Sequence, residues 1–177
     1  SATNQSNHAY KMGPIHWGTL ERGSKTASGC HILWPAHIGA FSMAMGKIST
    51  HPKVENLPFS YVIASGETTW LVPAVNLRTV GTWRDVGKWP KRDHRPVSAR
   101  RDIIDFAFPN PYIIQSVVEG RQILRRLVEE QGENVEEYSY GNCLIKKSAL
   151  VRGISIYDIA IRLFIHSVLQ KNEGALS

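Results

Sequence analysis

Histidines are the residues in the first third of the chain that could carry chemistry. The segment 8–45 contains four of them: His8, His16, His31 and His37. An imidazole titrates near neutral pH, so it can act as a general base that takes a proton from a sugar hydroxyl or amine. Such a base needs a group to hold its second nitrogen, and before residue 60 the sequence has only two acids, Glu21 and Glu55. A backbone carbonyl could fill that role instead.

The elements that must position these histidines follow a six-residue repeat in the blocks 20–25, 26–31, 32–37 and 38–43. The first position of each block holds Leu20, Thr26, Ile32 and Ile38, and the fifth holds a small residue: Ser24, Cys30, Ala36 and Ser42. A period of six fits neither a helix nor an alternating strand, and it is typical of a β-helix in which three short strands complete a coil of eighteen residues. We therefore expect first positions inside and fifth positions at corners.

Residues eighteen apart should stack in successive coils. This spacing predicts that His16 lies beneath Trp34 and that His37 lies above Thr19, with their side chains facing outward toward a neighbouring subunit. His16 and His37 are accordingly the candidate catalytic residues, each as a general base. The alternative is that they are ordinary surface or interface histidines.

The remaining pattern predicts short β-segments at 61–64 and 69–72, which form a hairpin or a final pair of coil strands, and helices over 111–131 and 156–171. Shorter helices are expected over 80–89 and 99–108. The expected fold class is the end of a left-handed parallel β-helix (residues 1–75) followed by a mainly α-helical C-terminal domain (residues 76–177). Because so few coils cannot bury a core alone, we expect the chain to be the end of a longer β-helix, with an independent short domain as the alternative.

Composition narrows the partners of this chain. It has 177 residues, a net charge of +6, and no uninterrupted apolar run of membrane-spanning length, so we expect no membrane partner. Cys30 and Cys143 lie far apart, and no Cys/His spacing indicates a metal site. We expect no metal and no cofactor, and the cysteine usage suits a cytoplasmic protein.

Charge is unevenly distributed along the chain. The segment 78–101 contains eight lysines or arginines against two aspartates, whereas 129–137 contains five glutamates and no basic residue. A basic segment that includes Trp83 and Trp89 could bind a phosphorylated small molecule or, less favoured, nucleic acid. The alternative is a solvated surface that pairs with the acidic segment.

Three stretches of the sequence, 36–47, 57–67 and 71–78, resemble the end of the hexapeptide-repeat UDP-N-acetylglucosamine acyltransferases. This resemblance implies a homotrimer that transfers an acyl group from coenzyme A or an acyl carrier to a nucleotide sugar, with its site at subunit boundaries. It implies a substrate-binding role for Asn76. Trp34 and Arg78 are further candidates for substrate binding, although Arg78 stands where the family has a carboxylate.

Taken whole, the chain also resembles large uncharacterised β-helix proteins of Bacteroides-type bacteria that carry a domain of unknown function (DUF4954-like). Three functions therefore stay open. The first is an acyltransferase-like enzyme, the second is a non-catalytic β-helix scaffold or assembly module, and the third is the C-terminal part of a sugar-phosphate nucleotidyltransferase.

Overall fold

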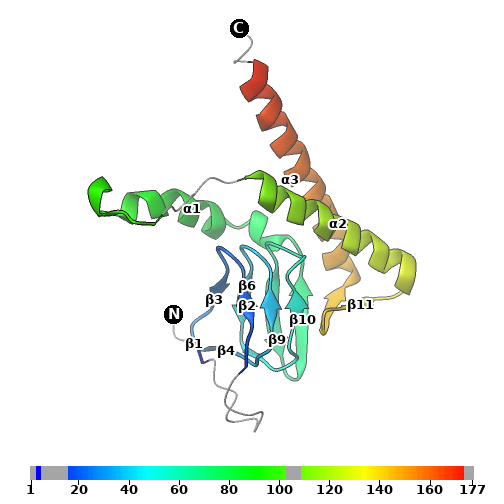
Figure 1. The fold of residues 1–177 in the computed structure, drawn as a ribbon. Coiled ribbons are helices and arrows are strands. Elements are labelled where there is room, and N and C mark those ends of the chain that lie inside the picture. Colours follow the sequence, from blue (N-terminus) through cyan, green and yellow to red (C-terminus); the bar gives the residue numbers. More distant parts are fainter. Residues whose placement is uncertain (1–2, 5–15, 103–108, 174–177) are drawn as a thin grey trace.

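The structure, a computed structural model, describes residues 3–4, 16–102 and 109–173 (Figure 1). Its strands are β1 (Thr3–Asn4), β2 (Thr19–Leu20), β3 (Lys25–Thr26), β4 (Cys30–Ile32), β5 (His37–Ile38), β6 (Met43–Met45), β7 (Lys47–Ile48), β8 (Lys53–Val54), β9 (Tyr61–Ser65), β10 (Thr68–Val72), β11 (Glu137–Tyr140) and β12 (Cys143–Lys146). Its helices are α1 (Val80–Arg92), α2 (Pro111–Gln131), α3 (Lys147–Glu173) and the short 3₁₀ turns η2 (Val75–Leu77) and η3 (Val97–Ala99).

The strands form three sheets. Two have three parallel strands each, in the orders β1-β4-β7 and β2-β5-β8, and the third has six strands in the order β11-β12-β10-β9-β6-β3. From β2 to β9, successive strands belong to different sheets in turn. Parallel partners lie eighteen residues apart at Thr19 and His37, but sixteen apart at His31 and Lys47.

The fold class expected from the sequence is wrong. In place of a left-handed parallel β-helix with a helical domain after it, the described residues form three sheets, and the largest is mixed. Strand β9 pairs antiparallel with β10, and β11 pairs antiparallel with β12. The β11–β12 hairpin also lies in the part expected to be mainly helical, and it joins the sheet through β10. The six-residue pattern predicted strands of one length and one spacing, whereas the strands differ in both.

The core agrees only partly with the predicted inward positions. Ile32 and Ile38 are fully buried, and so are the small residues Cys30 and Ala36. Leu20, which occupies the same repeat position as Ile32, is instead 41% exposed. The buried apolar cluster includes residues before and after position 75, and the predicted domain boundary there stays a prediction.

A column of left-handed corners runs along the sheets at eighteen-residue intervals. Gly23, Phe41 and Phe59 all have positive φ angles, of 70°, 54° and 59°. The two phenylalanine rings stack with their centroids 5.1 Å apart, and a Cβ at Gly23 would overlap the ring of Phe41. Positive φ is unfavourable for a residue with a side chain, so packing and hydrogen bonds must hold these corners.

The helices agree more closely with the sequence pattern. The helix predicted over 111–131 is α2, with Pro111 in its first turn, and the predicted hairpin is β9–β10. The helix expected over 156–171 belongs to α3, which begins earlier, at Lys147, and the expected helix over 80–89 is α1. Of the segment 99–108, residues 103–108 lie outside the described part of the chain.

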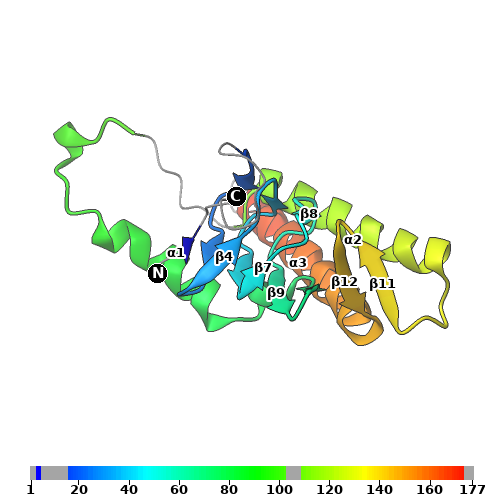
Figure 2. The same cartoon turned by 90° about the horizontal axis from the view of Figure 1, so that it is seen from below.

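The helices lie across one end of the strands, with α1 on one side and α2 and α3 crossing one another on the other side (Figure 1). Viewed from below, the β11–β12 hairpin lies beside this helix pair (Figure 2). Helices α2 and α3 therefore contact the β11–β12 side of the largest sheet, and they lie close to the last corner, at Phe59.

We predict different outcomes for the same substitution at two equivalent repeat positions. Ile32→Asp should abolish cooperative unfolding, because Ile32 is fully buried and an ionised carboxylate there would have no partner. Leu20→Asp should cost no more than about 1 kcal/mol, because Leu20 is 41% exposed. Thermal melts followed by circular dichroism measure both. Equal melting temperatures for the two variants would contradict the described burial.

Candidate functional site

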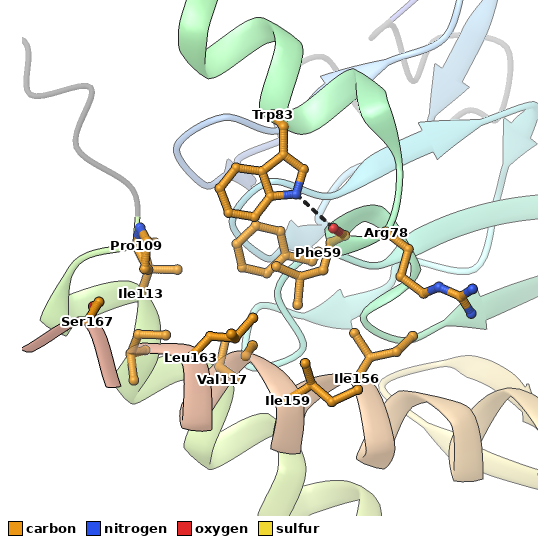
Figure 3. A pocket seen from close by; sticks show the side chains of 13 residues that line it. Phe59, Arg78, Trp83, Pro109, Ile113, Val117, Ile156, Ile159, Leu163 and Ser167 are labelled. Carbon is orange, nitrogen blue, oxygen red and sulfur yellow. Dashed lines mark hydrogen bonds between the residues drawn. The ribbon is translucent and has the colours of Figure 1, made fainter. Parts of the chain in front are cut away.

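The clearest concave site is an apolar pocket of about 280 Å³ between the helices and the end of the corner column (Figure 3). Its walls come from four parts of the chain: Phe59, the η2–α1 segment, the start of α2 and the middle of α3. The side chains that line it are Phe59, Leu77, Arg78, Trp83, Pro109, Ile113, Ile114, Val117, Ile156, Ile159, Ala160, Leu163 and Ser167. The pocket is therefore a hydrocarbon cavity with one charged residue, Arg78, in its lining.

The start of α2 is fixed by ordinary helix-capping chemistry. Asn110 is the N-cap, and its side-chain oxygen accepts a hydrogen bond of 3.0 Å from the backbone N–H of Ile113. Pro111 suits the first turn, because the N–H it lacks would have no partner inside the helix. The cap aims Ile113 and Val117, both fully buried, toward the pocket and the core.

Helices α2 and α3 are joined by a carboxylate shared between two arginines. Asp158 accepts a hydrogen bond of 2.6 Å from Arg121 and a longer one of 3.3 Å from Arg125. The hydrogen bond from Arg121, with the charges of both arginines, holds the pKa of Asp158 below its usual range. This link sets the distance between the two helices that form one side of the pocket.

A second link ties α3 to the corner column. The hydroxyl of Tyr157 is fully buried and donates a hydrogen bond of 2.5 Å to the backbone carbonyl of Pro58, next to Phe59. Burial raises the pKa of this phenol well above its ordinary value, so it stays protonated at neutral pH. Tyr157 therefore donates a structural hydrogen bond that holds α3 next to Phe59 in the pocket lining.

The mouth of the pocket combines an aromatic ring and a cation. The indole N–H of Trp83 donates a hydrogen bond of 3.0 Å to the carbonyl of Leu77 (Figure 3). This bond holds the ring against the η2–α1 segment. The opposite wall is formed by Ile159 and Leu163 of α3 (Figure 3). Arg78 is exposed, so its guanidinium can reach a ligand group at the edge of the pocket.

Of the catalytic and substrate-binding candidates predicted from the sequence, Arg78 lines this pocket, and so does Trp83 from the basic segment. Asn76, two residues before Arg78, is buried, and its amide makes hydrogen bonds inside the fold. Its Nδ2 donates a hydrogen bond of 2.5 Å to the carbonyl of Phe41, and its Oδ1 accepts one of 2.6 Å from the hydroxyl of Thr79. The structure thus gives Asn76 a structural task, and its role in substrate binding stays a prediction.

The candidate histidines lie in the sheets, away from the pocket. His16 precedes β2, and His37 belongs to β5, where it is paired in register with Thr19 and Lys53. Both are partly buried, and neither lines the pocket. The ring of Trp34 lies over Gly18, where a Cβ would overlap it. His8 lies outside the described residues.

The described residues offer few groups for covalent or metal chemistry. No set of three His, Cys, Asp or Glu side chains in that part of the chain could hold a metal ion. Both cysteines are buried, and burial raises the pKa of Cys143 to about 12, so its thiol is protonated at neutral pH. No described helix is long and apolar enough to cross a membrane.

Sequence reasoning missed most of the pocket, because its lining residues belong to segments more than one hundred positions apart. One signal could have indicated part of it: Ile156, Ile159 and Leu163 are apolar positions on one face of a helix. Apolar spacing alone predicts a buried face, and in the structure these three residues line a cavity.

We predict that Asp158→Asn lowers the free energy of unfolding at pH 7 by about 1 kcal/mol, in line with partly exposed charge-assisted hydrogen bonds. Because the pKa of Asp158 is lowered in the folded state, its contribution is complete above the ordinary carboxyl pKa and is lost as the pH falls through the folded pKa. Urea titrations at neutral and strongly acidic pH should show a difference from the parent chain only at neutral pH. Glu130→Gln is the control, because the Arg126–Glu130 pair is exposed and 3.9 Å long. A loss that persists in acid would show a steric effect.

Comparison with known proteins gives one result. The family model described as a domain of unknown function, DUF4954, matches residues 1–128 of the chain. Neither a curated protein nor a solved structure gives a significant match. The resemblance to UDP-N-acetylglucosamine acyltransferases is therefore not confirmed, whereas the resemblance to the uncharacterised family is. The match covers more than half of the chain, and the chain belongs to the DUF4954 family.

Proposed function

We propose that this chain binds the hydrocarbon part of an anionic molecule, such as a short fatty acid or the acyl chain of a coenzyme A or acyl-carrier thioester, whose phosphates carry the negative charge. The observation that carries the proposal is the pocket itself, a hydrocarbon-lined cavity with Arg78 and the Trp83 ring at its mouth. Ligand sites are typically apolar cavities with a few polar groups that fix orientation. The side chains that line this pocket have that composition.

The size of the pocket limits the ligand. Its volume of about 280 Å³ is at the lower end of ordinary small-molecule sites. If a methylene group needs roughly the 30 Å³ that a water molecule occupies in the liquid, the pocket holds on the order of ten such groups. A short acyl chain, or the end of a longer one, fits this volume.

Charge around the mouth favours an anionic end on the ligand. Arg78 presents a planar guanidinium, which pairs well with carboxylates and phosphates. Arg84, which pairs with Asp85 at 3.4 Å, and exposed Lys88 lie further along α1, the helix that carries Trp83. A group of cations raises the local concentration of anions. This supports the phosphorylated small molecule expected from the sequence over nucleic acid, because an apolar pocket does not bind a charged sugar-phosphate backbone.

Acyl transfer itself would need a base at the reacting atoms. His16 and His37 do not line the pocket, so the proposal is limited to binding, and a general-base role for either histidine stays a prediction. A scaffold or assembly module is the second candidate function, because α3 exposes the apolar side chains of Ile165, Val168 and Leu169.

Calorimetric titration with octanoate and octanol tests the proposed function. Both should bind the parent chain, because the pocket accepts a short hydrocarbon. Ala160→Phe should weaken both by at least about tenfold, since the added ring would occupy the pocket. Arg78→Gln should weaken octanoate by about five- to tenfold and leave octanol unchanged, because an exposed ion pair contributes about 1 kcal/mol.

Two controls keep this test specific. Lys88→Gln removes a cation that does not line the pocket, and it should change octanoate affinity far less than Arg78→Gln does. His37→Ala should leave both affinities unchanged. The proposal is overturned if the parent chain binds neither probe, or if Ala160→Phe leaves both affinities as they were while circular dichroism shows an intact fold.

A further inference from the structure

The distal part of α3 exposes apolar side chains in three directions. Figure 1 shows this part continuing past α2, away from the sheets. Leu163 is 62% exposed, Val168 39% and Leu169 56%. At 3.6 residues per turn, these three positions are separated by about 140°, 100° and 120° around the helix axis. A single flat protein face could not cover all three side chains, whereas an apolar medium around the helix could.

A basic arm, defined here as residues 86–102, extends from the helical end of the molecule. It contains the second half of α1 together with η3, and in both views it projects beyond the sheets (Figure 1, Figure 2). Six of its residues are lysine or arginine and two are aspartate. All six of these cationic residues are exposed. The arm therefore presents a surplus of positive charge to its surroundings.

The two aspartates of the arm are already paired inside it. Asp93 accepts a hydrogen bond of 2.9 Å from Arg95 and lies 3.5 Å from Arg100, and Asp102 accepts a hydrogen bond of 2.7 Å from Arg95. Four other cations of the arm have no ion pair among the described residues: Lys88, Lys91, Arg92 and Arg101. Their charges remain available to an anionic partner.

Positive and negative charges lie at opposite sides of the molecule. The five glutamates of the segment 129–137 are exposed, and this segment joins the end of α2 to β11. In both views the end of α2 and β11 lie on the side opposite the basic arm (Figure 1, Figure 2). An extended anionic surface would attract the arm and repel the acidic segment, so it would orient the whole chain.

We infer that the helical end of this chain binds the surface of an anionic lipid bilayer, with the basic arm on the headgroups and the distal part of α3 in the interfacial layer. Basic residues close to an anionic leaflet are attracted to it, and apolar side chains of a helix can enter the headgroup and acyl boundary without crossing the bilayer. The sequence argued against a membrane partner only through the missing membrane-spanning run, which surface binding does not need.

Two points separate this inference from other interpretations. Nucleic acid would suit the arm, but it would leave the apolar side chains of Val168 and Leu169 in water. The inference does not rest on the proposed function, because Val168, Leu169 and the arm do not line the pocket. Octanoate binding and bilayer binding can therefore fail separately.

Flotation of the whole chain with lipid vesicles tests the inference. Vesicles of equal parts phosphatidylglycerol and phosphatidylcholine should bind the chain at least about tenfold more tightly than vesicles of phosphatidylcholine alone, because the attraction of the arm needs anionic headgroups. Raising the ionic strength to about 1 M shortens the Debye length to about 3 Å and should weaken this binding.

Two double variants separate the contributions of charge and apolar surface. Lys88→Gln, Lys91→Gln removes two positive charges, and Val168→Gln, Leu169→Gln removes two apolar side chains while keeping a residue that favours a helix. Each should weaken binding to the anionic vesicles by at least about tenfold. Circular dichroism of each variant checks that the fold is intact.

Matched controls make the same chemical changes elsewhere. Lys47→Gln, Lys53→Gln removes two charges from strands β7 and β8, and Leu20→Gln, Val151→Gln removes two exposed apolar side chains away from the distal part of α3. Both controls should bind the anionic vesicles as the parent chain does.

The inference is overturned if the parent chain does not float with the anionic vesicles, or if the controls lose as much affinity as the test variants. It is also overturned if the Val168→Gln, Leu169→Gln variant binds the vesicles like the parent chain. In that case, binding of single-stranded RNA that depends on Lys88 and Lys91 would assign the arm to nucleic acid instead.

Discussion

The buried side chain of Asn76 is the interaction on which both the sheets and the pocket depend. Its side-chain amide donates a hydrogen bond to the carbonyl of Phe41, and its backbone N–H donates one of 2.8 Å to the carbonyl of Phe59. These two carbonyls belong to residues with positive φ, a conformation that costs a residue with a side chain on the order of 1–3 kcal/mol. Asn76 thus satisfies two corner carbonyls, and its oxygen accepts from Thr79, the residue before α1. One polar side chain closes the corner column and begins the helical part.

The shape of the pocket depends on the corner at Phe59. Phe59 forms part of its lining, and the neighbouring Pro58 carbonyl accepts the hydroxyl of Tyr157 from α3. The same helix is held to α2 through Asp158, so two links place the wall that faces Trp83. Because each link lies outside the cavity, the lining can remain hydrocarbon. The arrangement separates the residues that hold the site from those that would meet a ligand.

Sequence reasoning succeeded where one local pattern decides the structure. Helix α2 has the predicted bounds, because an N-cap, a proline and an apolar stripe agree, and the six-residue pattern correctly predicted the burial of Ile32 and Ile38. It failed where contacts from elsewhere decide. The helix expected over 156–171 begins earlier, at Lys147, and Gly153 within it packs so closely that a Cβ there would lie 2.9 Å from Pro73. The hairpin β11–β12 was missed, although Gly141-Asn142, both with positive φ, is a two-residue turn signal.

The site was harder to predict than the fold, because its two main features are not visible in a local pattern. Asn76, a polar residue in an apolar segment, is as consistent with ligand binding as with a structural hydrogen bond, and only the geometry shows its carbonyl partners. Helix α3 has one apolar face that packs on the core and another that lines the pocket, and it carries further apolar residues, such as Ile165 and Leu169, that are exposed. A pattern that shows only apolar spacing cannot separate these faces. Ala160 lines the pocket, whereas Ile165 is 52% exposed and does not line it, so only the folded geometry tells which apolar position of α3 a ligand would meet.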